Sequence, residues 1–327
     1  MAYSGTISQT NFNTRRVIEN AARRCKLPAQ SLTSEHIDIA NDQLYLLLSD
    51  LSNRGIQLWC IQKTVYPLYN GNSQIVTYEG TVDILNSNLR TLQQVTGINY
   101  DSANAREVFF ESPTMVNVVG IKWAANAVPV ALQRSDDGVT WTTIQTEAPS
   151  ATAGQWTWFD LATGIAANYF RVQSPDPLLY ERIYLGNTPT EIPLSRMSRD
   201  QYTNLPNKSF LSNRPLQFWL DRQAQSPVMN LWPVPNDAAE VQQIVVWVQR
   251  HIMDVGTMTE NIEVPQRWYE AIVAMLAAKL AMEYMEVDAG MIPMLDAKAK
   301  EALYYAQQEE QDNSPIMILP NISMYTR

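Results

Sequence analysis

The sequence predicts an α+β fold in which both ends of the chain form a helical domain and an all-β sandwich is inserted between them. Apolar residues recur with the 3.6-residue period of helices near the N-terminus and again from Ile262 onward. Between about 99 and 186 this period is absent, and short β-branched and aromatic runs alternate with turn residues. A length of 327 residues favours two domains over one.

Two amphipathic helices are expected near the N-terminus. Thr10 or Asn11 can cap the first, and Thr33 or Ser34 can cap the second. The expected buried face of the first helix consists of Val17, Ile18, Ala21, Ala22 and Cys25. The expected buried face of the second consists of Ile37, Ala40, Leu44, Leu47, Leu48 and Leu51. Both stripes predict packing against a common core.

A β-hairpin is expected after these helices. Residues 57–69 are rich in β-branched and aromatic side chains, and residues 74–78 have a similar composition. Between them lies Asn70-Gly71, a pair that favours the two-residue turns of hairpins. Residues 81–96 are expected to continue in extended or irregular form.

The central region is expected to be a self-contained β-sandwich of short strands. The predicted strands are 116–123, 128–133, 140–146, 156–161, 169–173 and 181–185. The turns between them include Asp136-Asp137-Gly138, Ala153-Gly154 and Gly164. After the sandwich, brief strands at 218–220 and 229–235 and a longer strand at 241–250 are expected to belong to the first domain.

Two further helices are expected in the C-terminal region. Pro265 and Pro293 lie in their first turns, where the missing N–H of proline breaks no hydrogen bond. The apolar side of the first helix consists of Trp268, Ile272, Met275, Leu276 and Met282, flanked by alanines. The buried stripe of the second consists of Leu295, Ala299, Ala302, Leu303 and Ala306.

The chain ends in an apolar tail that shows no helix or strand period. Apolar side chains outside any periodic element need a partner to cover them. The candidate partner-binding residues of the tail are Ser314, Pro315, Ile316, Met317, Ile318, Leu319, Pro320, Ile322, Met324 and Tyr325. The predicted organisation is therefore one discontinuous domain at 1–97 and 188–312, an inserted sandwich at 99–186, and an extended tail at 313–327.

The net charge of −9 is concentrated near the C-terminus. Residues 254–312 contain twelve acidic and four basic side chains, which gives 4 − 12 = −8. A protein that binds nucleic acid directly carries a basic stripe instead, so the sequence argues against that class. One basic cluster is present, and it is interpreted either as a solvated face or as a contact to an acidic protein. Its members are Arg15, Arg16, Arg23, Arg24 and Lys26.

Catalytic and metal-binding patterns are not found in the sequence. The two histidines, His36 and His251, have no neighbours at metal-ligand spacing, and no nucleotide-binding glycine motif or nucleophile elbow occurs. Cys25 and Cys60 are interpreted as core residues rather than as a disulfide. Asp136-Asp137 is interpreted as a turn rather than as a calcium site. The expectation is a protein that is not an enzyme and uses no cofactor or metal.

Part of the sandwich resembles the discoidin, or coagulation-factor C-type, jelly roll. Residues 131–141 end in a Ser-x-Asp-Gly-x-x-Trp-like turn, and residues 168–172 resemble the Arg-Tyr-x-Arg-aliphatic strand of that family, with Asn168 in place of the first arginine. Some relatives bind glycans. The resemblance therefore makes Trp141, Trp156 and Trp158 candidates for a glycan or partner contact, with core packing as the other interpretation.

The order of the remaining parts resembles the head-to-tail adaptor proteins of tailed phages, such as the tail tubular A and head-completion proteins of short-tailed phages. The resemblance rests on helices that end in Asn53-Arg-Gly-Ile-Gln-Leu-Trp59, on Leu231-Trp-Pro-Val-Pro235, and on a strand that ends in Gln249-Arg-His-Ile-Met-Asp254. Val264-Pro-Gln-Arg-Trp268 and two helices complete it. It covers about residues 8–97 and 188–327.

This resemblance implies a structural virion protein at the head-tail junction, assembled in the cytoplasm of a bacterial host. It implies a ring, commonly of twelve copies, that docks under the portal protein, extends the DNA channel and offers an attachment surface to the tail nozzle or tube, with tail fibres as a further candidate. Double-stranded DNA would pass without specific binding, and no membrane partner is expected. By position, portal binding falls on the tail residues.

A second hypothesis is a carbohydrate-binding protein that works through the jelly roll. Glycan binding would favour this hypothesis, whereas assembly on a portal would favour the adaptor. A glycan-cleaving enzyme is a third hypothesis, but it needs two carboxylates facing each other across a groove, and the sequence shows no such paired motif.

Overall fold

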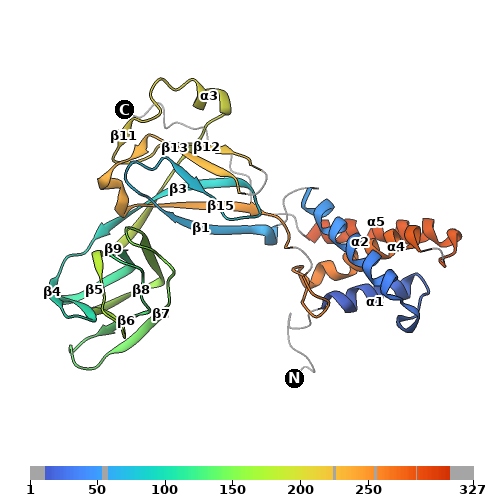
Figure 1. The fold of residues 1–327 in the computed structure, drawn as a ribbon, viewed down its shortest axis with the longest axis horizontal. Coiled ribbons are helices and arrows are strands. Elements are labelled where there is room, and N and C mark those ends of the chain that lie inside the picture. The colour runs from blue at the N-terminus through green and yellow to red at the C-terminus, as the bar shows by residue number, and fades with distance from the viewer. Residues whose placement is uncertain (1–11, 54–57, 224–225, 254–255, 285, 310–327) are drawn as a thin grey trace. The chain divides into compact units, whose positions relative to one another are not determined.

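The computed structural model describes residues 12–53, 58–223, 226–253, 256–284 and 286–309 (Figure 1). The chain divides into two compact units. One unit is helical and combines Met1–Ile61 with Arg250–Arg327, and the other is built mainly of strands and spans Gln62–Gln249.

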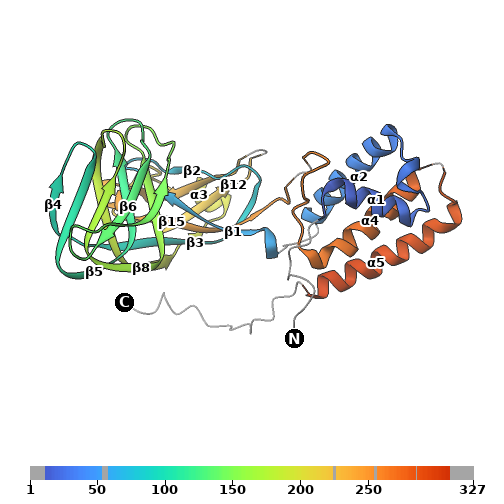
Figure 2. The same cartoon turned by 90° about the horizontal axis from the view of Figure 1, so that it is seen from below.

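The helical unit is built around one central helix. Its helices are α1 (Thr14–Arg24), α2 (Ser34–Asn53), α4 (Tyr269–Glu283) and α5 (Ile292–Glu309), with short 3₁₀ turns at Ala29–Ser31, Leu58–Cys60, Gln266–Trp268 and Ala289–Met291. α4 packs against each of α1, α2 and α5. Figure 2 shows α1 and α2 on one side of α4 and α5 on the other.

The predicted buried faces of α1, α2 and α5 are largely confirmed, because nearly all of their residues lie in one hydrophobic core. The cap of α1 differs from the prediction. The side chain of Asn13 accepts the N–H of Arg16 at 2.9 Å, whereas Thr10 and Asn11 lie outside the described residues. The cap of α2 is as expected, since Thr33 Oγ1 accepts the N–H of His36 at 3.3 Å.

α4 differs from the one-sided helix that the sequence predicted. Its alanine-rich flank is buried together with its large side chains, so the helix is covered on nearly all sides. This is the pattern of a helix in the middle of a core. Met282 was predicted to be buried but is 63% exposed, because it lies in the last turn, beyond the packed region.

The β unit contains fifteen named strands. They are β1 (Ile61–Pro67), β2 (Gln74–Val76), β3 (Thr81–Gln94), β4 (Ile98–Asp101), β5 (Ala105–Trp123), β6 (Val130–Ser135), β7 (Thr142–Glu147), β8 (Trp156–Gln173), β9 (Tyr180–Pro193), β10 (Ser195–Arg196), β11 (Leu211–Ser212), β12 (Gln217–Asp221), β13 (Val228–Trp232), β14 (Val234–Pro235) and β15 (Gln243–Arg250). A short helix, α3 (Arg199–Thr203), and a 3₁₀ turn, η3 (Asp237–Val241), complete the unit.

The largest sheet runs through two hydrophobic cores. Its strand order is β1-β15-β3-β9-β5-β8-β6-β7, with β4 paired to β5. The jelly-roll core lies among β5, β6, β8 and β9 and contains buried residues from Val108 to Leu185. The second β core contains residues between Tyr66 and Leu89 and between Leu194 and Val248. β10-β12-β13-β2 form a separate sheet, and β11 pairs with β14. The predicted domain boundaries stay a prediction.

Two strand predictions are wrong. β1 and β2 flank the turn at Asn70-Gly71 but do not pair with each other, because β1 lies beside β15 and β2 pairs with β13. The predicted strands at 156–161 and 169–173 are one long strand, β8. Gly164 lies inside β8 with a φ of 59°, where it forms an irregularity rather than ending the strand.

None of the helices in the described part of the chain combines the length and the apolar character needed to span a membrane.

Candidate functional site

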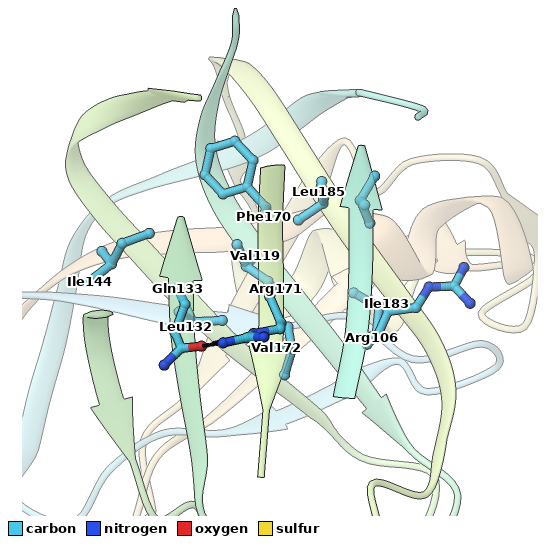
Figure 3. A pocket seen from close by; sticks show the side chains of 11 residues that line it. Arg106, Val119, Leu132, Gln133, Ile144, Phe170, Arg171, Val172, Ile183 and Leu185 are labelled. Atoms are coloured by element: carbon cyan, nitrogen blue, oxygen red, sulfur yellow. Dashed lines mark hydrogen bonds between the residues drawn. The ribbon is translucent and has the colours of Figure 1, made fainter. Parts of the chain in front are cut away.

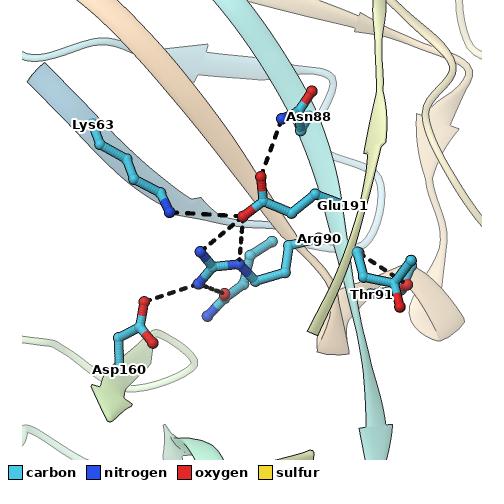
Figure 4. Close-up of polar contacts among 8 residues, drawn as sticks. Lys63, Asn88, Arg90, Thr91, Asp160 and Glu191 are labelled. Carbon is cyan, nitrogen blue, oxygen red and sulfur yellow. Dashed lines mark hydrogen bonds and ion pairs between the residues drawn. The ribbon is translucent and has the colours of Figure 1, made fainter. Parts of the chain in front are cut away.

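A buried arginine links the two β cores (Figure 4). Arg90 projects from β3, and only 5% of its side chain is exposed. Its guanidinium lies 3.0 Å from Asp160 on β8 and 3.0 Å from Glu191 on β9, and it donates to Gln243 on β15 at 3.4 Å. Four strands that are distant in sequence therefore meet at one charged group. We call Arg90, Asp160, Glu191 and Gln243 the Arg90 junction.

The environment of Glu191 keeps this carboxylate ionised. Partial burial alone would raise its pKa. Hydrogen bonds from Asn88 at 3.1 Å and from Arg90, together with the nearby charges of Lys63 and Arg90, outweigh burial and lower the pKa. Arg90 and Glu191 therefore form an ion pair in which each charge has more than one partner, as a stable buried ion pair requires.

A second polar contact connects the same two cores. Lys122 on β5 lies 2.9 Å from Glu240 of η3 and 3.4 Å from Glu181 on β9. Nearby, the hydroxyl of Tyr69 accepts the N–H of Trp156 at 3.2 Å. Hydrogen bonding to Glu240 contributes most to raising the pKa of Lys122, so the ammonium stays charged. The jelly roll is thus joined to its neighbour by covalent connections and by two groups of polar contacts.

One small cavity lies inside the jelly roll. A cavity of ≈ 10 Å³ is lined mainly by apolar side chains, with Gln133 and Arg171 at its border (Figure 3). This volume is at the limit for one water molecule. Arg171 donates from Nε and Nη2 to the amide oxygen of Gln133 at 2.9 and 2.6 Å, and its guanidinium lies 3.9 Å from the centre of the Trp141 ring. The guanidinium of Arg171 and the amide oxygen of Gln133 therefore already have partners within the protein.

Two open grooves lie on the surface of the β unit. The larger, ≈ 650 Å³, is bordered by the ends of β6, β7 and β8 near Pro129 and Pro175. The smaller, ≈ 340 Å³, contains Arg106 and Tyr180. Arg106 donates to Asp101 and to the hydroxyl of Tyr180, which in turn donates to Asp101 at 2.7 Å. These groups pair with one another.

The three tryptophans proposed for a glycan contact do not form one shared surface. Trp141 is half-buried, and the Arg171 guanidinium covers one face of its ring. Trp156 is 6% exposed, and its ring stacks on Trp158 at 4.8 Å between centroids. Trp158 also packs against Gly120, where an added Cβ would lie 2.4 Å from its ring. Their role in glycan or partner contact stays a prediction, but each of these rings has partners within the β unit.

In the turn at Asp136-Asp137-Gly138, a carboxylate accepts hydrogen bonds from the adjacent backbone. The Asp137 carboxylate accepts from Ser135 Oγ at 2.8 Å and from the N–H groups of Val139 and Thr140 at 2.9 and 2.7 Å. These hydrogen bonds, the backbone ones foremost, lower the pKa of Asp137 far below its usual value. Within the described ranges, no group of three His, Cys, Asp or Glu side chains is placed to hold a metal ion.

His36, Cys25 and Cys60 were predicted to have structural rather than functional roles. His36 and Cys25 both contact residues of the helical unit. His36 lies beside Tyr284, and Tyr284 donates to the His36 carbonyl at 2.6 Å. Cys25 and Cys60 are both buried cysteines. Cys25 donates to the carbonyl of Ala277 at 3.2 Å, and burial raises the pKa of its thiol to about 11. A thiol with this pKa stays protonated near neutral pH.

The basic cluster of α1 faces outward. Arg15 lies 2.8 Å from Glu19 in the next turn, and Arg24 lies 2.5 Å from Glu270 at the start of α4. Arg16, Arg23 and Lys26 are exposed. This arrangement matches the solvated-face interpretation, while a contact with an acidic protein stays a prediction. The tail that the sequence predicts to bind the portal, 314–325, lies outside the described residues.

Two exposed apolar faces of the helical unit were not predicted from the sequence. Tyr45 and Leu46 on α2 are 51% and 50% exposed, and Tyr304 and Tyr305 on α5 are each 59% exposed. Tyrosine is enriched at the buried centres of protein interfaces. The signal was present in the sequence, since these residues fall outside the predicted buried stripes.

Comparisons with known proteins found similar chains among solved structures. No family model and no curated protein matches the sequence. Among solved structures, the C-terminal domain of a chitobiase from Bacteroides fragilis is 12% identical with a TM-score of 0.23, and the match covers 27% of this chain and 64% of that domain, slightly less than two thirds. An F5/8 type C domain from the same organism is 10% identical with a TM-score of 0.23, covering 29% and 76%.

A third match is the chitosan-binding module 1 of a chitosanase/glucanase from Paenibacillus sp. IK-5, at 23% identity and a TM-score of 0.22, covering 28% of this chain and 74% of the module. These matches are to discoidin-type and carbohydrate-binding domains. At these TM-scores the likeness carries no inference about function. The resemblance to phage adaptors stays a prediction.

Proposed function

We propose that this protein is a structural adaptor that forms a ring, of twelve copies, at the head-to-tail junction of a tailed bacteriophage. The ring docks under the portal protein, extends the DNA channel and provides the attachment surface for the tail nozzle or tube, or for fibres. The protein is assembled in the host cytoplasm and works through its shape, without catalysis.

The observation that carries this proposal is that both ends of the chain fold into one helical unit. α1 and α2 from the N-terminal region share a single hydrophobic core with α4 and α5 from the C-terminal region. Along the chain, the strands of the β unit lie between α2 and α4. This is the order of parts on which the adaptor resemblance rests, with the jelly roll as an insertion.

The C-terminal tail supplies the portal contact in this proposal. It begins five residues after the end of α5, and seven of the last 14 residues, 314–327, are apolar. Folding of this segment onto the portal carries an ordering cost, which burial of its apolar side chains must exceed. The acidic balance of the chain suits a channel for DNA, because like charge keeps the polymer from binding to the wall.

We expect a chain that ends at Asp312 to lose portal binding. The loss follows because truncation removes every candidate tail residue but none of the residues of the helical core. Co-elution of each chain with its cognate portal ring in size-exclusion chromatography measures the effect. The control is a full-length chain with Tyr78→Ser. This variant changes an exposed residue of the β unit and should still bind the portal.

Equal portal binding by the truncated and full-length chains would contradict the role of the tail. Binding by neither would contradict the adaptor itself. Carbohydrate binding through the jelly roll is less well supported, because Trp141, Trp156 and Trp158 pack within the protein. Specific retention of the full chain on a glycan array would favour that alternative.

A further inference from the structure

The helical unit presents two exposed faces on opposite sides of its central helix. The α2 face consists of Asp38, Asp42, Tyr45, Leu46 and Ser49. The α5 face consists of Met294, Lys298, Glu301, Tyr304 and Tyr305. All ten residues are exposed, and four of them are large apolar or aromatic side chains at least half exposed. Because α2 and α5 lie on either side of α4, the two faces of one copy cannot meet each other (Figure 2).

The two helices run in the same direction. α4 and α5 follow each other through a short connection and pack together, which makes them antiparallel neighbours. α2 is also antiparallel to α4, since its first half contacts the end of α4: His36 accepts from Tyr284, and Gln43 donates to Glu283 at 3.4 Å. Copies related by a small rotation about a common axis would therefore bring α5 of one copy parallel to α2 of the next.

The two faces match in register and in charge. On α2, Asp38 precedes Tyr45 by seven residues, and on α5, Lys298 precedes Tyr305 by seven residues. Seven residues are about two helical turns, or about 10.5 Å, so each pair lies on one stripe. When parallel helices place Lys298 opposite Asp38, Tyr305 falls opposite Tyr45. Residues 34–53 contain acidic side chains and no lysine or arginine, which gives Lys298 an acidic partner surface.

We propose that the α2 face of one copy binds the α5 face of a second copy, with the helices parallel, Asp38 opposite Lys298 and Tyr45 opposite Tyr305. The contact joins two different surfaces. A repeated contact of this kind closes into a ring when the rotation between copies allows it. The inference rests on the proposed ring-forming function and names the surface that forms the ring. Glu301 comes one turn after Lys298 and meets Asp42, so one repulsion remains within the contact.

Cross-linking between two different chains, each with one introduced cysteine, tests this contact. A full-length Tyr45→Cys chain is mixed with a full-length Tyr305→Cys chain, and a bismaleimide links neighbouring thiols. Cys25 and Cys60 are 3% and 2% exposed and should not react. We expect linked pairs to contain one chain of each kind. Tyr45→Cys mixed with Tyr78→Cys is the matched control, and it should give no linked pair above background.

Charge reversal tests the register. Asp38→Lys in the first chain, or Lys298→Asp in the second, should lower the yield of linked pairs about ten-fold, because like charges then oppose each other. The two reversals together should restore the yield to within about two-fold of the parent pair. Glu301→Gln should raise the yield by about two-fold, since it removes the repulsion with Asp42.

Links between identical chains, insensitivity to both charge reversals, or no links at the highest concentration would each overturn the proposed contact. The experiment uses this protein alone, so its outcome is separate from that of the portal experiment. A chain that binds the portal but gives no mixed links keeps the adaptor and loses this contact. A chain that gives mixed links but ignores the portal keeps the contact and loses the adaptor.

Discussion

Trp268→Ala should destabilise the helical unit by about 3–5 kcal/mol, the range for removing a large aromatic side chain from a core. Trp268 is 0% exposed, and its ring packs edge-on against Trp59 at 4.9 Å between centroids. It comes immediately before α4, in the core that both ends of the chain share. Native-state amide hydrogen exchange should show faster opening of α1 and α4 together, because both pack on this core.

Trp247→Ala is the matched control for this prediction. Trp247 lies on β15 and is 39% exposed, so its removal should change the stability of the helical unit by less than about 0.5 kcal/mol. Unchanged exchange of α1 and α4 in the Trp268 variant would contradict a single core formed from both ends of the chain, on which the adaptor proposal depends.

Arg90→Leu should destabilise strands β3 and β9 by about 3 kcal/mol. The reason is that removal of one partner from a buried ion pair leaves the other partners without compensation, which costs about 3–5 kcal/mol. The lower end applies because Glu191 keeps Lys63 and Asn88, while 58% of the Asp160 side chain is exposed. Faster amide exchange in β3 and β9, by about a hundred-fold, would be the corresponding observation.

Arg196→Leu provides the control for a surface ion pair. Arg196 is 44% exposed and pairs with Asp83, which also contacts Arg222. Its replacement should therefore cost about 1 kcal/mol or less. If the two variants lose the same stability, Arg90 does not hold the jelly roll to the second β core. Glu191→Gln should show an intermediate effect, because it removes a charge and keeps a hydrogen-bonding group.

The helices were predictable from the sequence because the period of their apolar residues can be recognised within one short segment. Val17 to Cys25 and Ala40 to Leu51 repeat at helical spacing, and the structure buries the same side chains. The exposure of Met282 was not predictable, since the period continues through the last turn of α4 although the packing ends before it. Burial depends on what a neighbouring element covers, which the pattern of one helix does not contain.

Strand pairing was predicted less well because it depends on contacts between distant residues. The Asn70-Gly71 turn is present, but β1 and β2 pair with β15 and β13, which follow more than 150 residues later. No local signal specifies that choice. The same limit applies to the Arg90 junction. Arg90, Asp160, Glu191 and Gln243 are far apart in sequence, and each alone resembles an ordinary surface polar residue.

The candidate sites also differ in whether the sequence alone could identify them. The tail was identified from composition alone and lies outside the described residues. Tyr45 and Tyr305 fall outside the predicted buried stripes, but only the structure shows how far the α2 and α5 faces are exposed. Trp141 illustrates the opposite case. A turn motif marked it as a candidate contact, and the structure places the guanidinium of Arg171 over its ring.

The adaptor proposal is tested most directly by the mass of the complex that the purified protein forms with its cognate portal ring. Multi-angle light scattering gives this mass before and after saturation with the 37.1 kDa chain. The proposal predicts that the mass of the ring rises by that of twelve chains and then stays constant. A portal ring whose mass does not change when excess chain is present would contradict it.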